Sequence, residues 1–291
     1  TAAGTGSVKI TSTAATADYG NIGSTIDLAH TNAQAVSADL ANNATVKLSA
    51  AAGAGVTLAS DASATGAETV NITAAVTQTA VVNADDFETI NLLVDDGAAT
   101  VSTITLADLD GSDAAGSTVV VTGTDNLVLT GGNSANLNAS GLSGTLTATV
   151  ATDLKTITGG TGNDTFYSVG HASKFIFDSV TDAANGDIIL LDGLVVGTAA
   201  TVNGSWAKIT LAGAAGFSDY LEAATLADGS TDADVQYFAF DGNTYIVVDN
   251  SAGADFVAGT DTVIELVGVL DLSQSTLDAA NGKITLDVDG I

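Results

Sequence analysis

Short apolar runs separated by turn-forming residues recur along almost the whole of this 291-residue chain. Clear examples are Val8–Ile10, Val46–Leu48, Val119–Val121 and Ile188–Leu191, with Gly, Asp, Asn and Ser residues between such runs. Runs of this length are too short for most helices but suit β-strands, which Val and Thr also favour. The 32 Gly residues supply the turns that such a pattern needs. The pattern therefore predicts an all-β fold.

Part of the pattern repeats at a fixed interval. The segment Glu68–Ile72 reappears as Glu88–Leu92, 20 residues later, and Leu154–Thr158 is a looser third copy. A recurrence of about 20 residues is typical of one turn of a parallel β-solenoid. Two similar strands of a β-sandwich would give the same echo, so both architectures stay open at this point.

Tight turns and a few helices can also be placed on the sequence. Asn-Gly between two strand-like runs is a strong hairpin signal, and it occurs at Asn185-Gly186 and Asn281-Gly282. Asp241-Gly242 is a third turn of this kind. Helical periodicity is weak, and the best helix candidates are Asp219–Ala227 and the Ala-containing segment Leu28–Leu40.

The charge balance excludes several classes of partner. The chain has 34 acidic residues against six Lys and no Arg, which gives a formal net charge of −28. Nucleic acids and anionic membrane surfaces are bound through Lys and Arg, so neither is an expected partner. No uninterrupted apolar segment is long enough for a transmembrane helix, so no membrane insertion is expected. Most of the acids are Asp, a turn residue and a hard oxygen ligand.

The sequence also lacks the common catalytic patterns. It contains no Cys and only two His residues, so zinc-ligand spacings and cysteine nucleophiles are absent. Neither a phosphate-binding Gly-Lys-Ser/Thr motif nor a Gly-x-Ser-x-Gly elbow occurs. Carboxylate pairs carry little information in a chain with so many acids. We therefore expect a protein that is not an enzyme.

One motif carries specific chemistry. Gly159–Tyr167 matches the nonapeptide Gly-Gly-x-Gly-x-Asp-x-apolar-x at every defined position, with Phe166 at the apolar place. The glycines allow a tight turn whose carbonyl groups can face one centre, and Asp164 adds a carboxylate. Calcium takes six to eight oxygen ligands, so one such turn supplies only half a site. A plain glycine-rich turn without metal is the alternative reading.

The other half of the site must come from a neighbouring turn. Gly123–Leu127 resembles a decayed half-turn upstream, and three acidic residues follow the motif downstream. We predict Ca²⁺ as the cofactor, with two glycine carbonyls and four carboxylates as candidate ligands. These are Gly160, Gly162, Asp164, Asp178, Asp182 and Asp187.

The chain resembles the C-terminal region of RTX-type bacterial surface-layer proteins. The resemblance rests on the nonapeptide, on Lys174–Leu191, on Tyr237–Asp249 and on Gly259–Ile264, and the composition fits as well. The family usually has several nonapeptides in tandem, whereas this chain has one intact copy. The resemblance implies a calcium-dependent structural subunit that assembles with itself into a lattice on the cell surface. It also implies type I secretion through an uncleaved C-terminal signal, for which Leu286–Ile291 is the candidate.

These observations predict β-solenoid or β-roll-like stacked strands followed by a C-terminal β-hairpin domain. Residues 1–121 would be β-rich and stacked, residues 122–192 a short calcium-binding β-roll, and residues 193–291 a C-terminal β domain with the secretion signal. Expected partners are other copies of the chain and a cell-surface polysaccharide. Two other functions stay open: a surface adhesin of the same type, or an export and folding module of a larger secreted enzyme.

Overall fold

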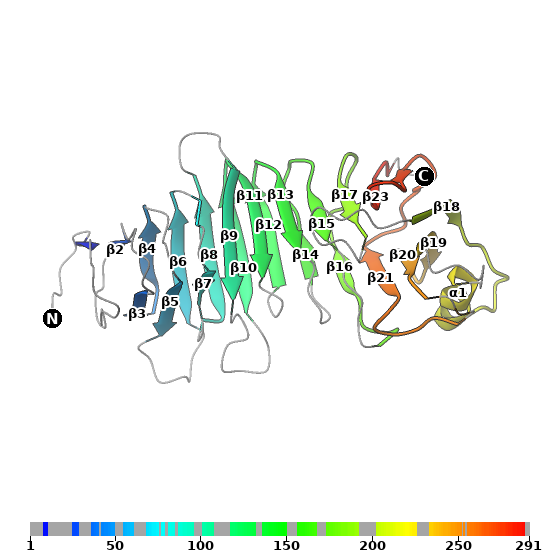
Figure 1. Cartoon of the computed structure of the whole chain (residues 1–291), viewed down its shortest axis with the longest axis horizontal. Helices are drawn as coiled ribbons and strands as arrows, with labels where there is room; N and C mark the ends of the chain where they lie inside the picture. The colour runs from blue at the N-terminus through cyan, green and yellow to red at the C-terminus, as the bar shows by residue number, and fades with distance from the viewer. Residues whose placement is uncertain are drawn as a thin grey trace. The chain divides into compact units, whose positions relative to one another are not determined.

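The structure is a computed structural model, and it describes the residues given at the end of this paragraph. They form two compact units, one comprising Thr1–Thr149 with Gly160–Gly162 and the other Val150–Gly159 with Asn163–Ile291. Almost all regular structure in both units is β-strand (Figure 1). The prediction of an all-β, stacked-strand fold is therefore confirmed. The described residues are 8–10, 25–28, 36–40, 42–49, 55–60, 68–75, 77–78, 81–84, 87–95, 101–107, 117–131, 136–149, 156–167, 173–191, 202–225, 233–251, 253 and 255–288.

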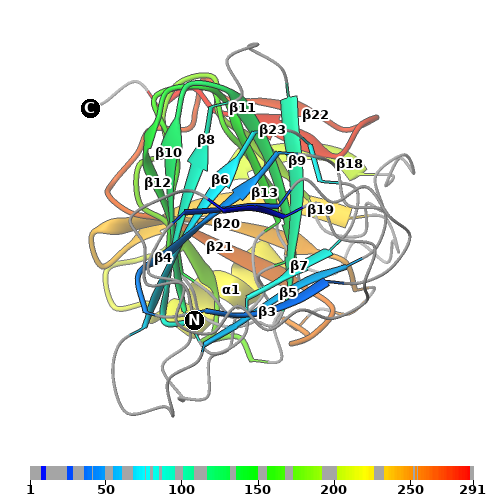
Figure 2. The ribbon, with the colours of Figure 1, turned by 90° about the vertical axis from the view of Figure 1, so that its left-hand side faces the viewer.

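The described strands of the first unit form two parallel sheets. From β2 to β13, successive strands along the chain belong to one sheet and then to the other, so each pair of strands forms one turn of a solenoid. The two sheets are seen as separate layers from the N-terminal end (Figure 2). One sheet contains β1 (Val8–Ile10), β2 (Thr25–Leu28), β4 (Ala44–Leu48), β6 (Thr69–Ala74), β8 (Thr89–Val94), β10 (Thr118–Gly123) and β12 (Asn136–Leu142). The other contains β3 (Val36–Leu40), β5 (Val56–Ser60), β7 (Val81–Asn83), β9 (Val101–Ala107), β11 (Asn126–Gly131) and β13 (Leu146–Thr149).

The sequence echo marks two neighbouring turns of this solenoid. Strands β6 and β8 pair in parallel, with Val70 opposite Ile90 and Ile72 opposite Leu92. Both strands bury every second side chain, as expected when only one face of a sheet meets the core. The polar face continues the repeat, because the Asn91 amide Nδ2 donates to Asn71 Oδ1 at 2.9 Å. The solenoid reading of the echo is thus confirmed for this part of the chain.

The second unit begins with the same stacking and ends in antiparallel strands. Strands β14 and β16 pair in parallel, as do β15 and β17. Thereafter β19, β20 and β21 form an antiparallel meander, and β22 and β23 form a hairpin that lies antiparallel to β17. One sheet contains β14 (Thr156–Thr158), β16 (Asp178–Val180), β21 (Thr262–Leu266), β20 (Asn243–Asp249), β19 (Ala233–Phe240) and β18 (Val202–Lys208). The other contains β15 (Thr165–Tyr167), β17 (Ile188–Leu190), β23 (Lys283–Thr285) and β22 (Thr276–Asp278).

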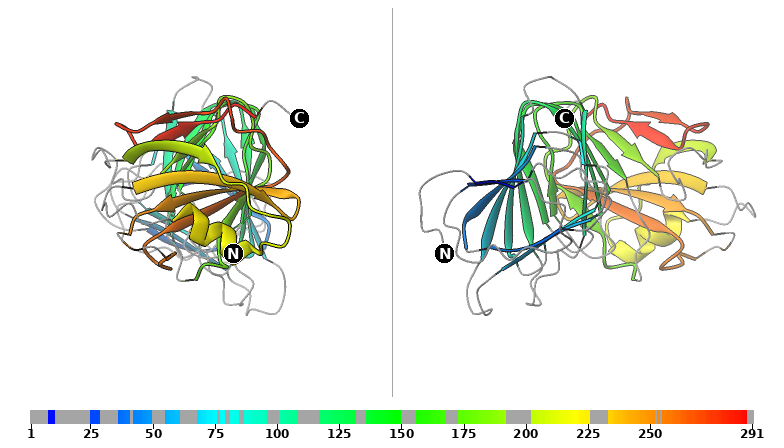
Figure 3. Two further views of the ribbon diagram at one scale, coloured as in Figure 1. Left: turned by 90° about the vertical axis from the view of Figure 1, so that its right-hand side faces the viewer. Right: turned by 60° about the vertical axis from the view of Figure 1, so that its left-hand side comes forward.

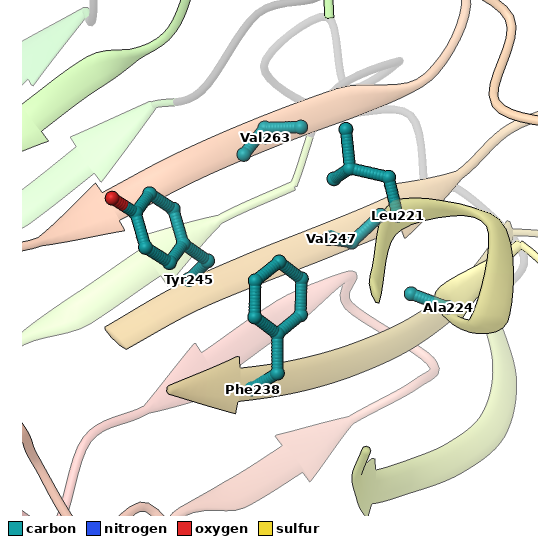
Figure 4. Packing of buried hydrophobic residues seen from close by; sticks show 6 residues of the cluster. All are labelled: Leu221, Ala224, Phe238, Tyr245, Val247 and Val263. Carbon is teal, nitrogen blue, oxygen red and sulfur yellow. The ribbon is translucent and has the colours of Figure 1, made fainter. Parts of the chain in front are cut away.

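A short helix covers the meander. Helix α1 (Phe217–Ala224) lies against β19 and β20 (Figure 3). Its Leu221 and Ala224 pack on Phe238, Tyr245 and neighbouring valines to form an apolar cluster (Figure 4). Phe217, Phe238 and Tyr245 thus form an aromatic group on the helix-covered face of this sheet, whereas Trp206 and Tyr237 stack on each other elsewhere in the unit. Among the described residues, no helix has the length and apolar character needed to cross a membrane.

The turn predictions can now be compared with the structure. Asp241-Gly242 joins β19 to β20 with positive φ angles of 47° and 88°, the geometry of a type I′ hairpin turn. Asn281-Gly282 joins the hairpin β22–β23. Asn185-Gly186 is also a turn, but it leads from β16 to β17, which lie in different sheets. The three-part domain division stays a prediction.

The helix predictions met with different outcomes. Helix α1 overlaps the predicted segment Asp219–Ala227. The predicted helix Leu28–Leu40 is wrong, because Leu28 ends β2 and Val36–Leu40 forms β3. Both strands pair with neighbours that are far along the chain, so tertiary pairing overrides the helix propensity of Ala.

Candidate metal-binding turns

The nonapeptide forms the turn between β14 and β15. Its first half packs tightly on the preceding turn of the first unit. A β-carbon on Gly160 would lie 2.4 Å from the carbonyl oxygen of Leu142, and one on Gly162 would lie 2.7 Å from that of Gly144. The Thr161 amide also donates to the Leu142 carbonyl at 3.1 Å. These two glycines are therefore required for stacking, whether or not their carbonyl groups bind a metal.

The stack continues one turn further back. A β-carbon on Gly144 would lie 2.2 Å from the carbonyl oxygen of Asp125, and the Thr145 amide donates to Asn126 Oδ1 at 2.8 Å. Asp125 and Asn126 belong to the segment that the sequence indicated as a decayed half-turn. That segment is thus part of the same column of turns, one step removed from the nonapeptide.

In the second unit, the other half of the nonapeptide turn meets the turn Thr181–Asp187. The Gly159 amide donates to Asp182 Oδ1 at 2.7 Å, and the Asp164 amide donates to Asp187 Oδ1 at 2.8 Å. The Ile188 amide in turn donates to the carbonyl of Asp164 at 2.8 Å. The structure therefore brings together three of the predicted ligands, Asp164, Asp182 and Asp187.

The Asp164 side chain folds back over the start of its own turn. A β-carbon on Gly159 would lie 2.3 Å from Asp164 Oδ2. Only 2% of Asp164 and 3% of Asp187 are exposed to solvent. Because a buried carboxylate is costly unless it is paired or hydrogen-bonded, this turn concentrates negative charge at an unfavourable place.

Burial and the neighbouring negative charges raise the pKa of Asp187. Burial is the main cause that raises this pKa from 3.8 to about 6, and the neighbouring charges of Asp164 and Asp182 act in the same direction. Hydrogen bonds from the amides of Asp164 and Ala184 act against it. A bound cation would remove the repulsion, since an opposite charge favours the ionised form.

Asp178 lies at the other end of β16 from this group. It is buried at the first position of the strand, opposite Ile264, whereas Asp182 follows the end of the strand. Three strand residues span roughly 10 Å. Asp178 stays a predicted ligand.

The segment Leu286–Val288 is hydrogen-bonded to the turn Thr181–Asp187. The Gly186 amide donates to the Leu286 carbonyl, and the Leu286 amide donates to the carbonyl of Asp187. Asn185 Oδ1 accepts from the Val288 amide at 2.5 Å. Gly186 has a φ of +93°, and a β-carbon there would lie 2.6 Å from Asn163 Nδ2. The segment Leu286–Val288, predicted only as part of an export signal, is thus also structural.

The donor set suits a hard cation. Carboxylate and carbonyl oxygens are the ligands of calcium, and the zinc ligands Cys and His are missing from these turns. Each oxygen that accepts one N–H keeps a second lone pair for a metal. Across the described residues, no three acidic or His side chains converge as a closed metal cage. A hard cation at these turns would therefore need further oxygen ligands from main-chain carbonyl groups or water.

Sequence reasoning missed several contacts. Leu142 and Gly144, which receive the first half of the turn, match no nonapeptide and gave no signal as its neighbours. Gly159 is the first position of the motif and lies outside the predicted ligands, although its missing side chain makes room for the Asp164 carboxylate. The Gly-Gly pair at Gly159-Gly160 is the sequence feature that indicates it.

No protein-family model matches the chain, and no curated protein resembles it with significant similarity.

Proposed function

We propose that this chain is a calcium-dependent structural subunit of a bacterial surface layer, exported by type I secretion and assembled from copies of itself. The role is structural and not catalytic. The observation that carries the proposal is the gathering of Asp164, Asp182 and Asp187 at two stacked turns of a solenoid. The family resemblance of the nonapeptide supplies the cellular setting.

The charge of the chain supports a role for an external cation. With 34 acids and six Lys, the protein holds few internal counter-ions. Self-repulsion destabilises a compact state of high net charge, and a divalent cation at the buried carboxylates relieves it where it is strongest. A metal that binds only the folded state also stabilises it by mass action. Calcium would thus couple folding to the extracellular medium.

The three carboxylates of the second unit are the ligands that this proposal rests on. Asp164, Asp182 and Asp187 would hold the ion together with main-chain oxygens of the same turns. The carbonyl groups of Gly160 and Gly162 stay predicted ligands, as does Asp178 at the far end of β16.

Stacked parallel strands suit a lattice subunit. Each inner strand is hydrogen-bonded to a neighbouring strand on either side, so the solenoid of the first unit resists bending and needs no disulfide. The chain contains no Cys, which fits stabilisation by metal in place of cross-links.

The test compares thermal unfolding by circular dichroism, with light scattering, in millimolar calcium and in excess chelator. Calcium should raise the midpoint and promote large assemblies, which electron microscopy should show as sheets. Asp182→Asn should reduce the shift in the midpoint. The matched control is Asp278→Asn, because Asp278–Gly282 repeats the sequence of Asp182–Gly186 in the exposed hairpin β22–β23.

Each other outcome has a definite meaning. A midpoint that calcium does not change would contradict the metal site. A calcium-stabilised monomer that never forms sheets but binds a receptor or glycan would favour an adhesin. A gene that encodes a catalytic domain ahead of this sequence would favour an export and folding module.

A further inference from the structure

A second group of buried carboxylates lies far along the chain from the nonapeptide. Asp234 on β19 stands opposite Asp249 on β20, and Val248 stands opposite Thr262 on β21. The next position along β20 and β21 places Asp261 beside Asp249. Asp249 is 5% exposed and Asp261 is 1% exposed. Two acidic side chains are therefore buried side by side at one end of the meander.

The two carboxyl groups have different hydrogen-bond partners. Asp261 accepts the Asn250 amide on Oδ1 at 2.9 Å and the Val257 amide on Oδ2 at 2.6 Å. Asp249 accepts the Ser251 amide and hydroxyl on Oδ1, at 2.9 and 3.2 Å. The Ser251 hydroxyl also donates to Asp261 Oδ2 at 3.4 Å, so it lies between the two carboxyl groups. Because both oxygens of Asp261 accept main-chain N–H groups, Asp249 is the better placed of the two to hold a proton in acid.

Acidic residues predominate around the pair. Residues 209–282 contain no Lys, Arg or His. Lys174 lies in the segment Ser173–Phe177, whose Phe177 ring is 5.4 Å from that of Tyr245 on β20. The other described charged groups on helix α1, on the neighbouring strands, on the hairpin turn and in the loop before β21 are all acidic: Asp219, Glu222, Asp234, Asp241, Asp255, Asp261 and Glu265. Two adjacent buried carboxylates cannot both ionise without strong repulsion, so a proton is the simplest way to hold them together.

The pair fastens the loop that joins β20 to β21. Its amides at Asn250, Ser251 and Val257 all bond to one or other carboxyl group, and Asn250 Nδ2 donates to the Thr260 carbonyl at 3.0 Å. Val257 is 42% exposed although its amide is bonded to the buried Asp261. Phe256 beside it packs against the apolar cluster under helix α1. The loop is thus held by this one ring and by the hydrogen bonds to the carboxyl pair.

We propose that Asp249 and Asp261 form a proton-dependent latch, which holds the loop between β20 and β21 closed in acid and releases it as the pH rises towards neutral. In the closed state, the pair carries one negative charge and one proton. Loss of the proton places two charges side by side, and the loop amides separate from them. This device is independent of the calcium proposal, because it involves neither the nonapeptide nor its neighbours.

The direction and size of the effect follow from the titration of Asp249. Burial, followed by the charge of Asp261, raises its pKa from 3.8 to about 6. A raised pKa means that the closed loop binds the proton more tightly than the open loop, so closure is favoured in acid and weakened up to about pH 6. Between pH 5 and pH 7.5, linkage gives about a tenfold increase in the open population.

The test is hydrogen–deuterium exchange of the full chain in chelator at pH 5 and pH 7.5, corrected for the intrinsic exchange rates. Peptides covering residues 249–261 should lose about tenfold protection at the higher pH. Asp249→Asn keeps a neutral donor towards Asp261 and should retain protection at both values. Asp187→Asn, in the other acidic group, should leave the pH dependence of this loop unchanged.

A second measurement on the unmodified protein guards against a misfolded variant. Infrared difference spectra should show the carbonyl stretch of buried protonated carboxyl groups at pH 5 that disappears by pH 7.5. Because Asp187 has a similarly raised pKa and would contribute such a band, the share that remains in Asp187→Asn is the one assigned to Asp249. Equal protection of the loop at both pH values, or no such band, would overturn the latch. Loss of protection in chelator at both pH values that is restored by calcium would mean that a cation, and not a proton, joins the pair.

Discussion

The missing side chain of Gly159 makes room for the carboxylate of Asp164, since a β-carbon at residue 159 would stand 2.3 Å from Oδ2. The position of the Asp164 carboxylate therefore depends on the absence of a side chain at Gly159, five positions earlier in the nonapeptide. Gly159→Ala should displace the carboxylate and destabilise the protein by about 1–3 kcal/mol. Urea unfolding in chelator measures this cost.

The matched control for that variant is Gly213→Ala. Nothing lies within 4 Å of a β-carbon there, so the free energy of unfolding should change by less than about 0.5 kcal/mol. Calcium titration of both variants adds the functional comparison. Equal calcium response in Gly159→Ala and the unmodified protein would show that the position of the Asp164 carboxylate is immaterial to the metal.

Asp187 should make the stability of the calcium-free protein depend on pH. Because its folded-state pKa is raised to about 6, its contribution is fully present below about pH 4 and is lost as the pH rises through 6. The loss is at most about 3 kcal/mol, from roughly 1.4 kcal/mol per pKa unit. The difference in unfolding free energy between the unmodified protein and Asp187→Asn, followed from pH 4 to pH 7, isolates this group. A difference that does not vary with pH would refute the assignment.

The aromatic cluster under helix α1 should be a main source of stability for the second unit. Phe238 is fully buried and its ring lies 5.7 Å from that of Phe217 and 5.4 Å from that of Tyr245. Phe238→Ala should cost about 3–5 kcal/mol. Phe175→Ala is the comparison, since that ring is 60% exposed and should cost below about 1 kcal/mol. Chemical denaturation followed by the far-ultraviolet circular dichroism signal distinguishes the two.

The stability of the first unit should depend on the side-chain hydrogen bond between Asn91 and Asn71. Asn71 donates its Nδ2 to the carbonyl groups of Asn43 and Ala44, so its Oδ1 must face Asn91. Asn91→Asp replaces the donor to that oxygen with an acceptor and should cost about 1–2 kcal/mol. Asn138→Asp should be almost neutral, because Asn138 accepts only through Oδ1, from the amide and hydroxyl of Ser140. Similar losses in both variants would argue against the amide stack.

The fold could be predicted where the sequence repeats and where turns have their own chemistry. The echo of Glu68–Ile72 in Glu88–Leu92 identified two strands in register, and Asp241-Gly242 identified a hairpin. Leu28–Leu40 could not be assigned from local propensity, because the pairing that makes it two strands comes from residues far along the chain.

The candidate site was predictable in part for the same reason. The nonapeptide located its own turn, and the nearby acids suggested Asp182 and Asp187. Asp178 is similarly close to the nonapeptide in sequence, so sequence distance alone could not distinguish it from Asp182 and Asp187. In the structure it lies at the start of strand β16, whereas Asp182 follows the end of that strand. Leu142 and Gly144 escaped notice because the nonapeptide is not repeated there, so no periodicity pointed to the turn beneath.

The antiparallel hairpin beside β17 ends the parallel order of this sheet. Parallel strands stacked one above another would accept further strands in the same sense, as fibrils do. In the second unit, β23 runs opposite to β17, and β22 runs opposite to β23, so the described strands do not continue the solenoid of this sheet beyond β17. A strand added to β17 in the parallel sense of the solenoid would therefore have to displace this hairpin.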